Sequence, residues 1–126
     1  MKKKIVLEYP FRCTPGSLFR ALSTPVGLQS WFADRVTANG NQYDFYWSKS
    51  RQSAHVVHHK PNAYVRYQWD EAENHYFEFR IAHQELTGDI LLTVTDFASP
   101  DEMEDCRALW DMQVAKLKRA IGCPKK

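Results

Sequence analysis

The sequence predicts an α+β domain in which a curved antiparallel sheet of about six or seven strands wraps around a long C-terminal helix, with two short helices after the first strand. Three observations lead to this prediction. Helix-start signals follow the first strand, aromatic and polar residues alternate through the middle, and the last quarter of the chain carries an amphipathic helical pattern. The length of 126 residues fits a single domain over residues 1–126, long enough to bury a hydrophobic core.

The N-terminal part predicts one strand and two short helices. Residues 3–9 are compatible with a strand, and Pro10 is expected to end it because proline cannot donate to a strand ladder. We expect the helices at about residues 15–22 and 25–31. Each would start from an N-cap threonine followed by proline at the first helical position, as in Thr14-Pro15 and Thr24-Pro25.

The middle of the chain alternates aromatic with polar residues, which is typical of strands with one buried face. In three segments, apolar residues occupy every second position and would therefore point to one face of a strand. They are Tyr43, Phe45 and Trp47; Val65, Tyr67 and Trp69; Phe77, Phe79 and Ile81. Turn signals occur at residues 39–41 and 87–89. Residues 90–97 are apolar and β-branched enough for a further strand, but their pattern does not select an inward face.

The C-terminal helix has clear start and stop signals. Ser99 is expected as the N-cap, with Pro100 at the first helical position and Glu102 at the capping-box position. Gly122 and Pro124 are expected to end the helix. Apolar side chains recur at steps of three and four between these signals, at Met103, Cys106, Trp110, Val114, Leu117 and Ile121.

The composition excludes several classes of protein. A formal net charge of +2 argues against nucleic-acid binding, which usually needs a strongly basic face. No apolar run is long enough to span a membrane, and the short run after the first lysines is too brief for a signal peptide. Three widely spaced cysteines, at positions 13, 106 and 123, support neither a disulfide framework nor a zinc ribbon. We therefore expect a cytoplasmic protein with reduced thiols.

The chain resembles the START-like (SRPBCC) superfamily, and specifically the branch of the Activator of Hsp90 ATPase homologues. The resemblance covers residues 5–121, and its best motif is T-P-x-x-L-x-x-W-F at residues 24–32, followed by the aromatic strands and by Trp110 with Leu117. It implies a helix-grip fold whose sheet and long helix enclose a cavity that often takes an apolar ligand. One departure is Thr95-Asp96-Phe97, where the family often has His and Gly before the Phe.

The aromatic residues predict the wall of a ligand cavity. Buried Tyr and Trp need partners for their polar tips, so clusters of them suit an amphipathic cavity better than a dry core. We expect a small, mostly apolar molecule to bind there, and the alternative is that these side chains simply fill the core. The predicted wall consists of Tyr43, Phe45, Trp47, Tyr67, Trp69, Phe77, Phe79, Trp110 and Val114.

Neither a metal site nor an enzyme is expected. In a strand, His55 and His59 share a face and His58 opposes them, so the three converge only at a bulge or bend. We expect these histidines on the surface or at a cavity rim, and we predict no metal and no cofactor. The sequence contains no nucleophile motif with a base beside it. If the protein resembled START-like cyclases or hydrolases in activity, Tyr67 or His83 would be the candidate catalytic residue.

A protein-interaction module is the second class of function that stays open. The resemblance implies a possible chaperone partner similar to that of Hsp90 activators. Other aromatic residues occupy the alternate positions of these strands and would point to the opposite face of the sheet. These residues, Tyr46, Tyr64 and Tyr76, would instead mark a sheet surface for a homodimer. Glu78 and Arg80 would point to the same face, and we expect them to form a solvated ion pair.

Overall fold

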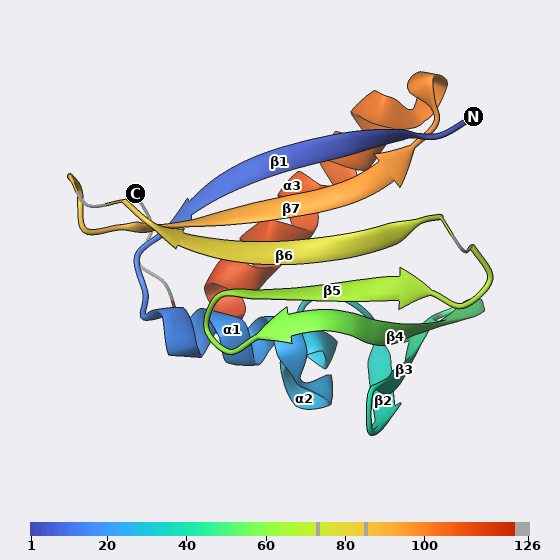
Figure 1. Ribbon diagram of the computed structural model, residues 1–126, viewed down its shortest axis with the longest axis horizontal. Helices are drawn as coiled ribbons and strands as arrows, with labels where there is room; N and C mark the ends of the chain where they lie inside the picture. Colours follow the sequence, from blue (N-terminus) through green and yellow to red (C-terminus); the bar gives the residue numbers. More distant parts are fainter. Residues whose placement is uncertain (73, 85, 123–126) are drawn as a thin grey trace.

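The computed structural model describes residues 1–72, 74–84 and 86–122, and it shows one curved antiparallel sheet packed against a long helix. Within the described residues, the sheet has seven strands in the order β1-β7-β6-β5-β4-β3-β2 (Figure 1). Helix α3 crosses one face of this sheet (Figure 1), while α1 contacts β5 and β6, and α2 contacts α1 and β2. The elements are β1 (Lys3–Phe11), α1 (Pro15–Ser23), α2 (Pro25–Gln29), β2 (Arg35–Asn39), β3 (Gln42–Trp47), β4 (Ser50–Lys60), β5 (Tyr64–Trp69), β6 (Tyr76–His83), β7 (Ile90–Ala98), the 3-10 helix η1 (Pro100–Glu102) and α3 (Met103–Ala120). The predicted fold class is confirmed.

Strand β1 continues past Pro10, so the prediction that this proline ends the strand is wrong. Pro10 pairs with Leu91 in the register of β1 and β7, and the strand runs on to the buried Phe11. The reason is that β1 is an edge strand, and its other side has no neighbour to which a backbone N–H would have to donate.

The two threonine caps form as predicted. The Ser17 backbone N–H donates to Thr14 Oγ1 at 3.1 Å, and that of Gly27 donates to Thr24 Oγ1 at 3.0 Å. Helix α2 ends at Gln29, two residues earlier than expected. The chain then turns, so that Trp31 and Phe32 are buried against the sheet.

The predicted strand parities are confirmed. The named residues of β3, β5 and β6 point inward, and only Trp47 and Trp69, at the ends of their strands, are partly exposed. The inward face of β7, which the pattern left open, consists of Ile90, Leu92, Val94 and Ala98. Strand β2 was not predicted, because only Val36 of its five residues is buried and no alternation is visible.

The C-terminal helix begins differently from the prediction. Residues 100–102 form the 3-10 turn η1, and the Ser99 hydroxyl donates to Glu102 Oε1 at 2.7 Å instead of capping a backbone N–H. The apolar stripe packs on the sheet as expected, with Trp110, Val114 and Leu117 fully buried. Gly122 follows the helix with a φ of +73°, which suits its predicted role, whereas Pro124 and Cys123 lie outside the described residues.

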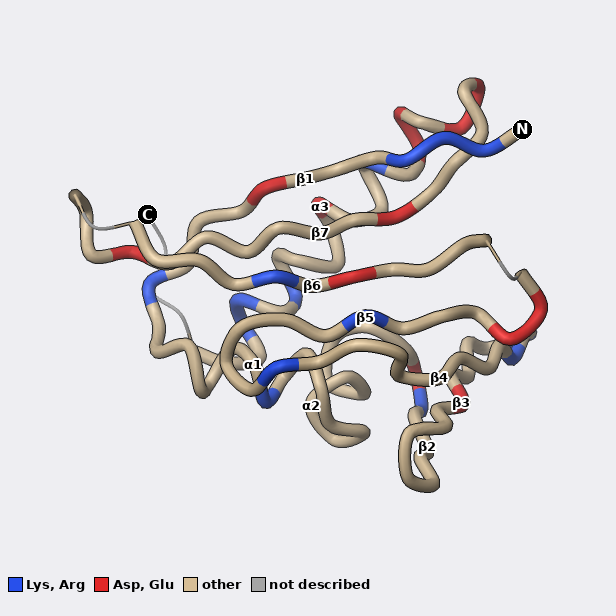
Figure 2. Tube along the Cα trace, viewed as in Figure 1, with Lys and Arg blue, Asp and Glu red and all other residues tan. Residues whose placement is uncertain are grey.

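Glu78 is not part of a solvated pair. Its side chain is only 10% exposed, and it accepts from Arg66 Nε at 2.8 Å as well as from Arg80 Nε at 3.3 Å. Figure 2 shows these charges side by side on β5 and β6. Tyr76 packs on the Arg66 guanidinium and Tyr64 on that of Arg80, at 3.9 Å and 4.5 Å from the ring centres, so each arginine contacts both the carboxylate and an aromatic ring.

Candidate functional site

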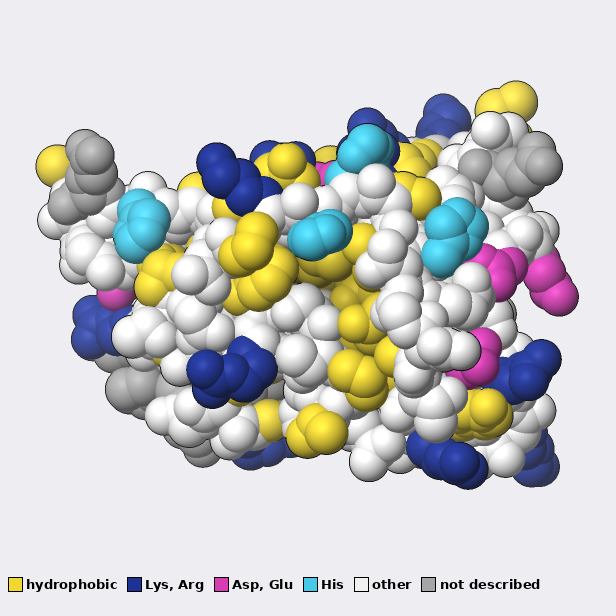
Figure 3. All heavy atoms as spheres, turned by 60° about the horizontal axis from the view of Figure 1, so that its bottom comes forward, with side chains coloured by type: hydrophobic (Ala, Val, Ile, Leu, Met, Phe, Trp, Pro, Cys, Tyr) yellow, Lys and Arg dark blue, Asp and Glu magenta, His cyan; other side chains and the backbone are white. Residues whose placement is uncertain are grey.

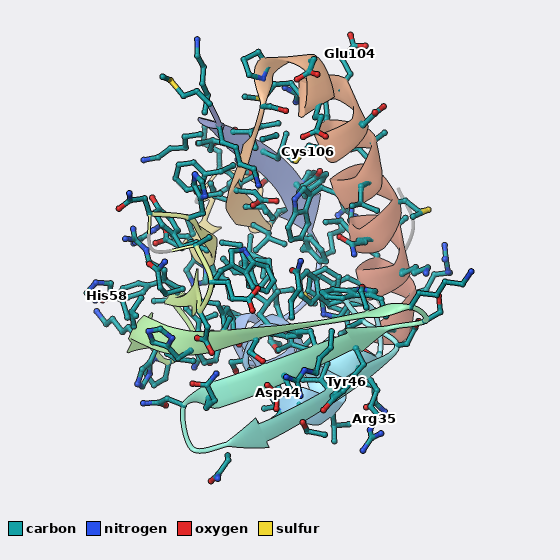
Figure 4. All side chains as sticks on the ribbon, turned by 90° about the vertical axis from the view of Figure 1, so that its right-hand side faces the viewer. Arg35, Asp44, Tyr46, His58, Glu104 and Cys106 are labelled. Atoms are coloured by element: carbon teal, nitrogen blue, oxygen red, sulfur yellow. The ribbon has the colours of Figure 1, made fainter. Side chains whose placement is uncertain are left out.

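A cavity of about 680 Å³ lies between α3, the connection from α2 to β2, and the inner side of the sheet, where β3, β4, β5, β6 and β7 each supply a lining residue. This volume is within the range that small-molecule sites occupy, roughly 300–1,000 Å³. Figure 4 shows the helix standing off the sheet with side chains between the two. The cavity is lined by Gln29, Ser30, Trp31, Phe32, Ala33, Asp34, Trp47, Gln52, Trp69, Phe77, Asp96, Leu109, Trp110, Met112, Gln113 and Lys116.

All four tryptophans of the chain line this cavity. Three of their indole N–H groups are held by protein acceptors. Trp31 Nε1 donates to Ala21 O at 2.8 Å, Trp47 Nε1 to Phe32 O at 3.1 Å, and Trp110 Nε1 to Asp96 Oδ2 at 2.9 Å. These bonds fix the orientation of the rings, so the aromatic wall is preformed.

Asp96 is the acidic group that reaches the cavity from the sheet. Its Oδ1 accepts from the Phe97 backbone N–H at 2.8 Å. Burial raises the pKa of Asp96 above its ordinary value, although the hydrogen bonds from Trp110 and Phe97 and the charge of Lys2 oppose this rise. The carboxylate is therefore held in place but incompletely solvated.

Cys106 stands behind this carboxylate and is not an activated nucleophile. Figure 4 shows its side chain on the side of α3 that faces the sheet, and its Sγ lies 3.8 Å from Asp96 Oδ2. Burial and the neighbouring carboxylate raise the pKa of the thiol to about 11. At neutral pH the sulfur is protonated.

The structure divides the predicted cavity wall into two groups. Four of its members line the cavity, namely Trp47, Trp69, Phe77 and Trp110. The other five are buried or packed in the core and do not line it, namely Tyr43, Phe45, Tyr67, Phe79 and Val114. Sequence reasoning missed Trp31 and Phe32, although both belong to the T-P-x-x-L-x-x-W-F motif, and it missed Asp96 because the inward face of its strand was undecided.

The polar tips of the buried tyrosines hold helix α1. Tyr67 donates its hydroxyl to Leu22 O, and Tyr43 donates to Ser23 O, each at 2.8 Å. Trp31 Nε1 donates to Ala21 O, and the Thr24 hydroxyl donates to Arg20 O. Each of the last four carbonyls of α1 therefore accepts a side-chain hydrogen bond. The two tyrosine hydroxyls therefore anchor the C-terminal end of α1. Burial raises the pKa of Tyr67 above its ordinary value, so this hydroxyl does not readily transfer its proton as a catalytic acid would.

The histidines do not form a site together. His55 Nδ1 lies 2.8 Å from Asp70 Oδ1, and a β-bulge between Val56 and His58 separates the neighbouring residues of β4. His58 points away from the protein in Figure 4, and Figure 3 shows the histidines of this face spaced apart along one side. His83 is exposed at the end of β6. In the part of the chain that the structure describes, no three His, Cys, Asp or Glu residues could hold a metal ion together.

Comparisons with known proteins agree on the fold. A family model described as the START-like superfamily domain matches residues 1–123. A Bacteroides fragilis protein with a solution structure is 38% identical, with 99% of this chain and 95% of that chain covered and a TM-score of 0.69. No curated protein matches the chain.

Two more distant solved structures are named as an Aha1 dimer and as an AHSA1-like protein. The Aha1 dimer of Colwellia psychrerythraea is 19% identical, covers 94% of this chain and 96% of its own, and has a TM-score of 0.80. The AHSA1-like protein of Aeromonas hydrophila is 12% identical, covers 95% and 92%, and has a TM-score of 0.75. At these identities the likeness shows the fold alone. Among the described residues, no helix could span a membrane.

Proposed function

Because the chain belongs to the START-like superfamily, we propose that it binds a small apolar or amphipathic molecule in the cavity between the sheet and α3. The observation that carries this proposal is that all four tryptophans of the chain line a cavity of about 680 Å³. Aromatic side chains with a few polar groups are typical of small-molecule sites. A cytoplasmic location belongs to the same proposal.

The two groups of predicted wall residues have different roles in this proposal. Trp47, Trp69, Phe77 and Trp110 contact the ligand directly, together with Trp31 and Phe32. The core residues behind them hold these rings in place. Phe45, for example, packs against Trp47 with ring centres 6.1 Å apart, and Tyr67 stacks on Phe77 at 4.8 Å. A preformed wall lowers the entropy that binding would otherwise cost.

The neutral fluorescent probe N-phenyl-1-naphthylamine tests the proposal. We expect it to bind and to quench tryptophan emission by energy transfer, because every indole lies on the cavity wall. Replacing the apolar residues at the cavity mouth, Leu109→Glu with Met112→Glu, is expected to weaken this binding about tenfold, since two apolar contacts are lost. Both side chains are about half exposed, so the fold should tolerate the change.

Val26→Glu is the matched control for the cavity mouth. Val26 is 82% exposed on α2 and does not line the cavity, so this variant should bind the probe as the wild type does. If the wild-type protein neither bound the probe nor lost tryptophan emission, ligand binding in this cavity would be refuted.

The outer sheet face supports a second candidate function, which is protein interaction. Tyr46 lies under the Arg35 guanidinium at 5.2 Å, in the same way that Tyr64 and Tyr76 pack with arginines. Figure 4 shows Tyr46 and Arg35 on the outside of β2 and β3. Tyr and Arg are enriched in interfaces and among their hot spots, so a second copy of this chain or a chaperone could dock here.

Sedimentation velocity tests this surface. Tyr46→Glu combined with Tyr64→Glu is expected to leave the fold intact, because both rings are only partly buried, and to dissociate a homodimer. Retention of Hsp90 from the host should be lost in the same variant if the partner is a chaperone. A wild-type protein that sediments as a monomer and retains no Hsp90 would exclude this second function, and Val26→Glu again serves as the control.

A further inference from the structure

The buried charge of the cavity is negative. Three ionisable residues line it, and two of them, Asp34 and Lys116, are exposed. Asp96 is mostly buried, and its carboxylate lies between the sheet and α3. Because water and salt screen exposed charges far more than buried ones, Asp96 dominates the field that a bound molecule would experience.

This carboxylate has acceptor capacity to spare. It accepts hydrogen bonds from Trp110 Nε1 on Oδ2, from the Phe97 backbone N–H on Oδ1, and from the weak thiol donor of Cys106 on Oδ2. An ionised carboxylate offers about four lone-pair sites. No lysine or arginine among the described residues forms an ion pair with Asp96, and the cation that influences its carboxylate most, Lys2, is exposed just before β1.

A cationic group would relieve the cost of burying this carboxylate, whereas an anionic group would increase it. The aromatic wall has the same preference, because the faces of Trp and Phe rings attract cations. The apolar volume beside Asp96 has room for a hydrocarbon or aromatic body. From this geometry we infer that the cavity selects amphipathic amines, with the protonated nitrogen on Asp96 and the apolar body among the tryptophans. This inference rests on the proposed function and specifies its ligand class.

Three probes of similar size and different charge test the inference: 4-phenylbutylamine, 4-phenylbutanol and 4-phenylbutyrate. Titration calorimetry and quenching of tryptophan emission are both suitable readouts. We expect the amine to bind about tenfold more tightly than the alcohol, since a hydrogen bond to a charged group contributes more than a neutral one, and the butyrate to bind most weakly.

Asp96→Asn is expected to abolish the preference for the amine while the alcohol still binds with wild-type affinity. Asp34→Asn, at the exposed mouth, is the matched control and should keep the preference. Retained binding of the alcohol and of N-phenyl-1-naphthylamine shows that the Asp96→Asn cavity is intact.

The wild-type protein supplies a readout that does not depend on the variant folding. The amine stays protonated from pH 8 to pH 4, as a lysine does, while Asp96 gains a proton as the pH falls. The preference for the amine over the alcohol should therefore decline towards low pH. Lys2, Lys116 and the Cys106 thiol also face this region, and repeating the pH series with Asp34→Asn separates the contribution of Asp96 from that of the exposed mouth carboxylate.

The possible outcomes separate the two proposals. If the three probes bind equally well, or if Asp96→Asn keeps the preference for the amine, the amine inference is overturned and ligand binding stands. If neither these probes nor N-phenyl-1-naphthylamine bind, the proposed function itself fails.

Discussion

Replacement of Phe32 by alanine is expected to lower the free energy of unfolding by about 3–5 kcal/mol. Phe32 lies in the connection from α2 to β2 and is only 5% exposed. Its ring stacks on Phe77 of the sheet at 5.2 Å and on Trp110 of α3 at 5.8 Å. It therefore joins the helix to the sheet, and its loss leaves a void that neither side can fill alone.

Phe97→Ala is the matched control for this prediction. Phe97 is partly exposed on the outer face, where it packs on Tyr76 at 5.0 Å, and its loss should cost on the order of 1 kcal/mol. Urea unfolding should be followed by far-UV circular dichroism, because Phe32 borders three tryptophans and the substitution itself alters their emission. Equal losses in the two variants would show that Phe32 is not part of the core.

The second large effect is expected at Gly27, where alanine should cost about 3 kcal/mol through overpacking. A Cβ at this position would lie directly against the Arg20 carbonyl oxygen and 2.7 Å from Ala21 Cα, both in the backbone of α1. Helix α2 would have to move away from α1. That movement would also break the bond from the Gly27 N–H to Thr24 Oγ1 and displace Trp31 from the cavity wall.

Gly16→Ala separates this steric effect from the general effect of replacing glycine in a helix. Gly16 is in the first turn of α1, and the nearest atom to its Cβ position is Asn62 Oδ1 at 3.8 Å. This change should stabilise the protein by about 0.5–1 kcal/mol, because alanine loses less backbone entropy on folding. Thermal unfolding measures both variants, and a neutral Gly27→Ala would contradict the tight packing of α1 on α2.

Local signals in the sequence were sufficient for most of the secondary structure. The threonine caps at Thr14 and Thr24 act within one helical turn, so nothing distant changes their geometry. The aromatic parities of β3, β5 and β6 were readable for a similar reason, since side chains alternate along any strand. Pro10 misled the prediction because its effect depends on whether the strand has one neighbour or two, which is a property of the sheet.

The candidate cavity could be predicted only in part. The hypothesis that buried tyrosine hydroxyls favour a ligand site did not foresee that Tyr43 and Tyr67 would donate to Ser23 and Leu22. The carbonyls at the end of α1 need donors, and the sheet supplies them from residues 20 and 45 positions further along the chain. Pairing at such a separation leaves no local pattern in the sequence.

By itself, the sequence determined that aromatic side chains occupy one face of the sheet and that an amphipathic helix covers it, because strand and helix periodicities are local properties of the chain. Only the tertiary structure decided which rings fill the core and which border open space. That division depends on how far α3 stands from the sheet, and this distance is set where Phe32, Phe77 and Trp110 meet. These residues come from three separate elements, so their contact exists only in the folded protein.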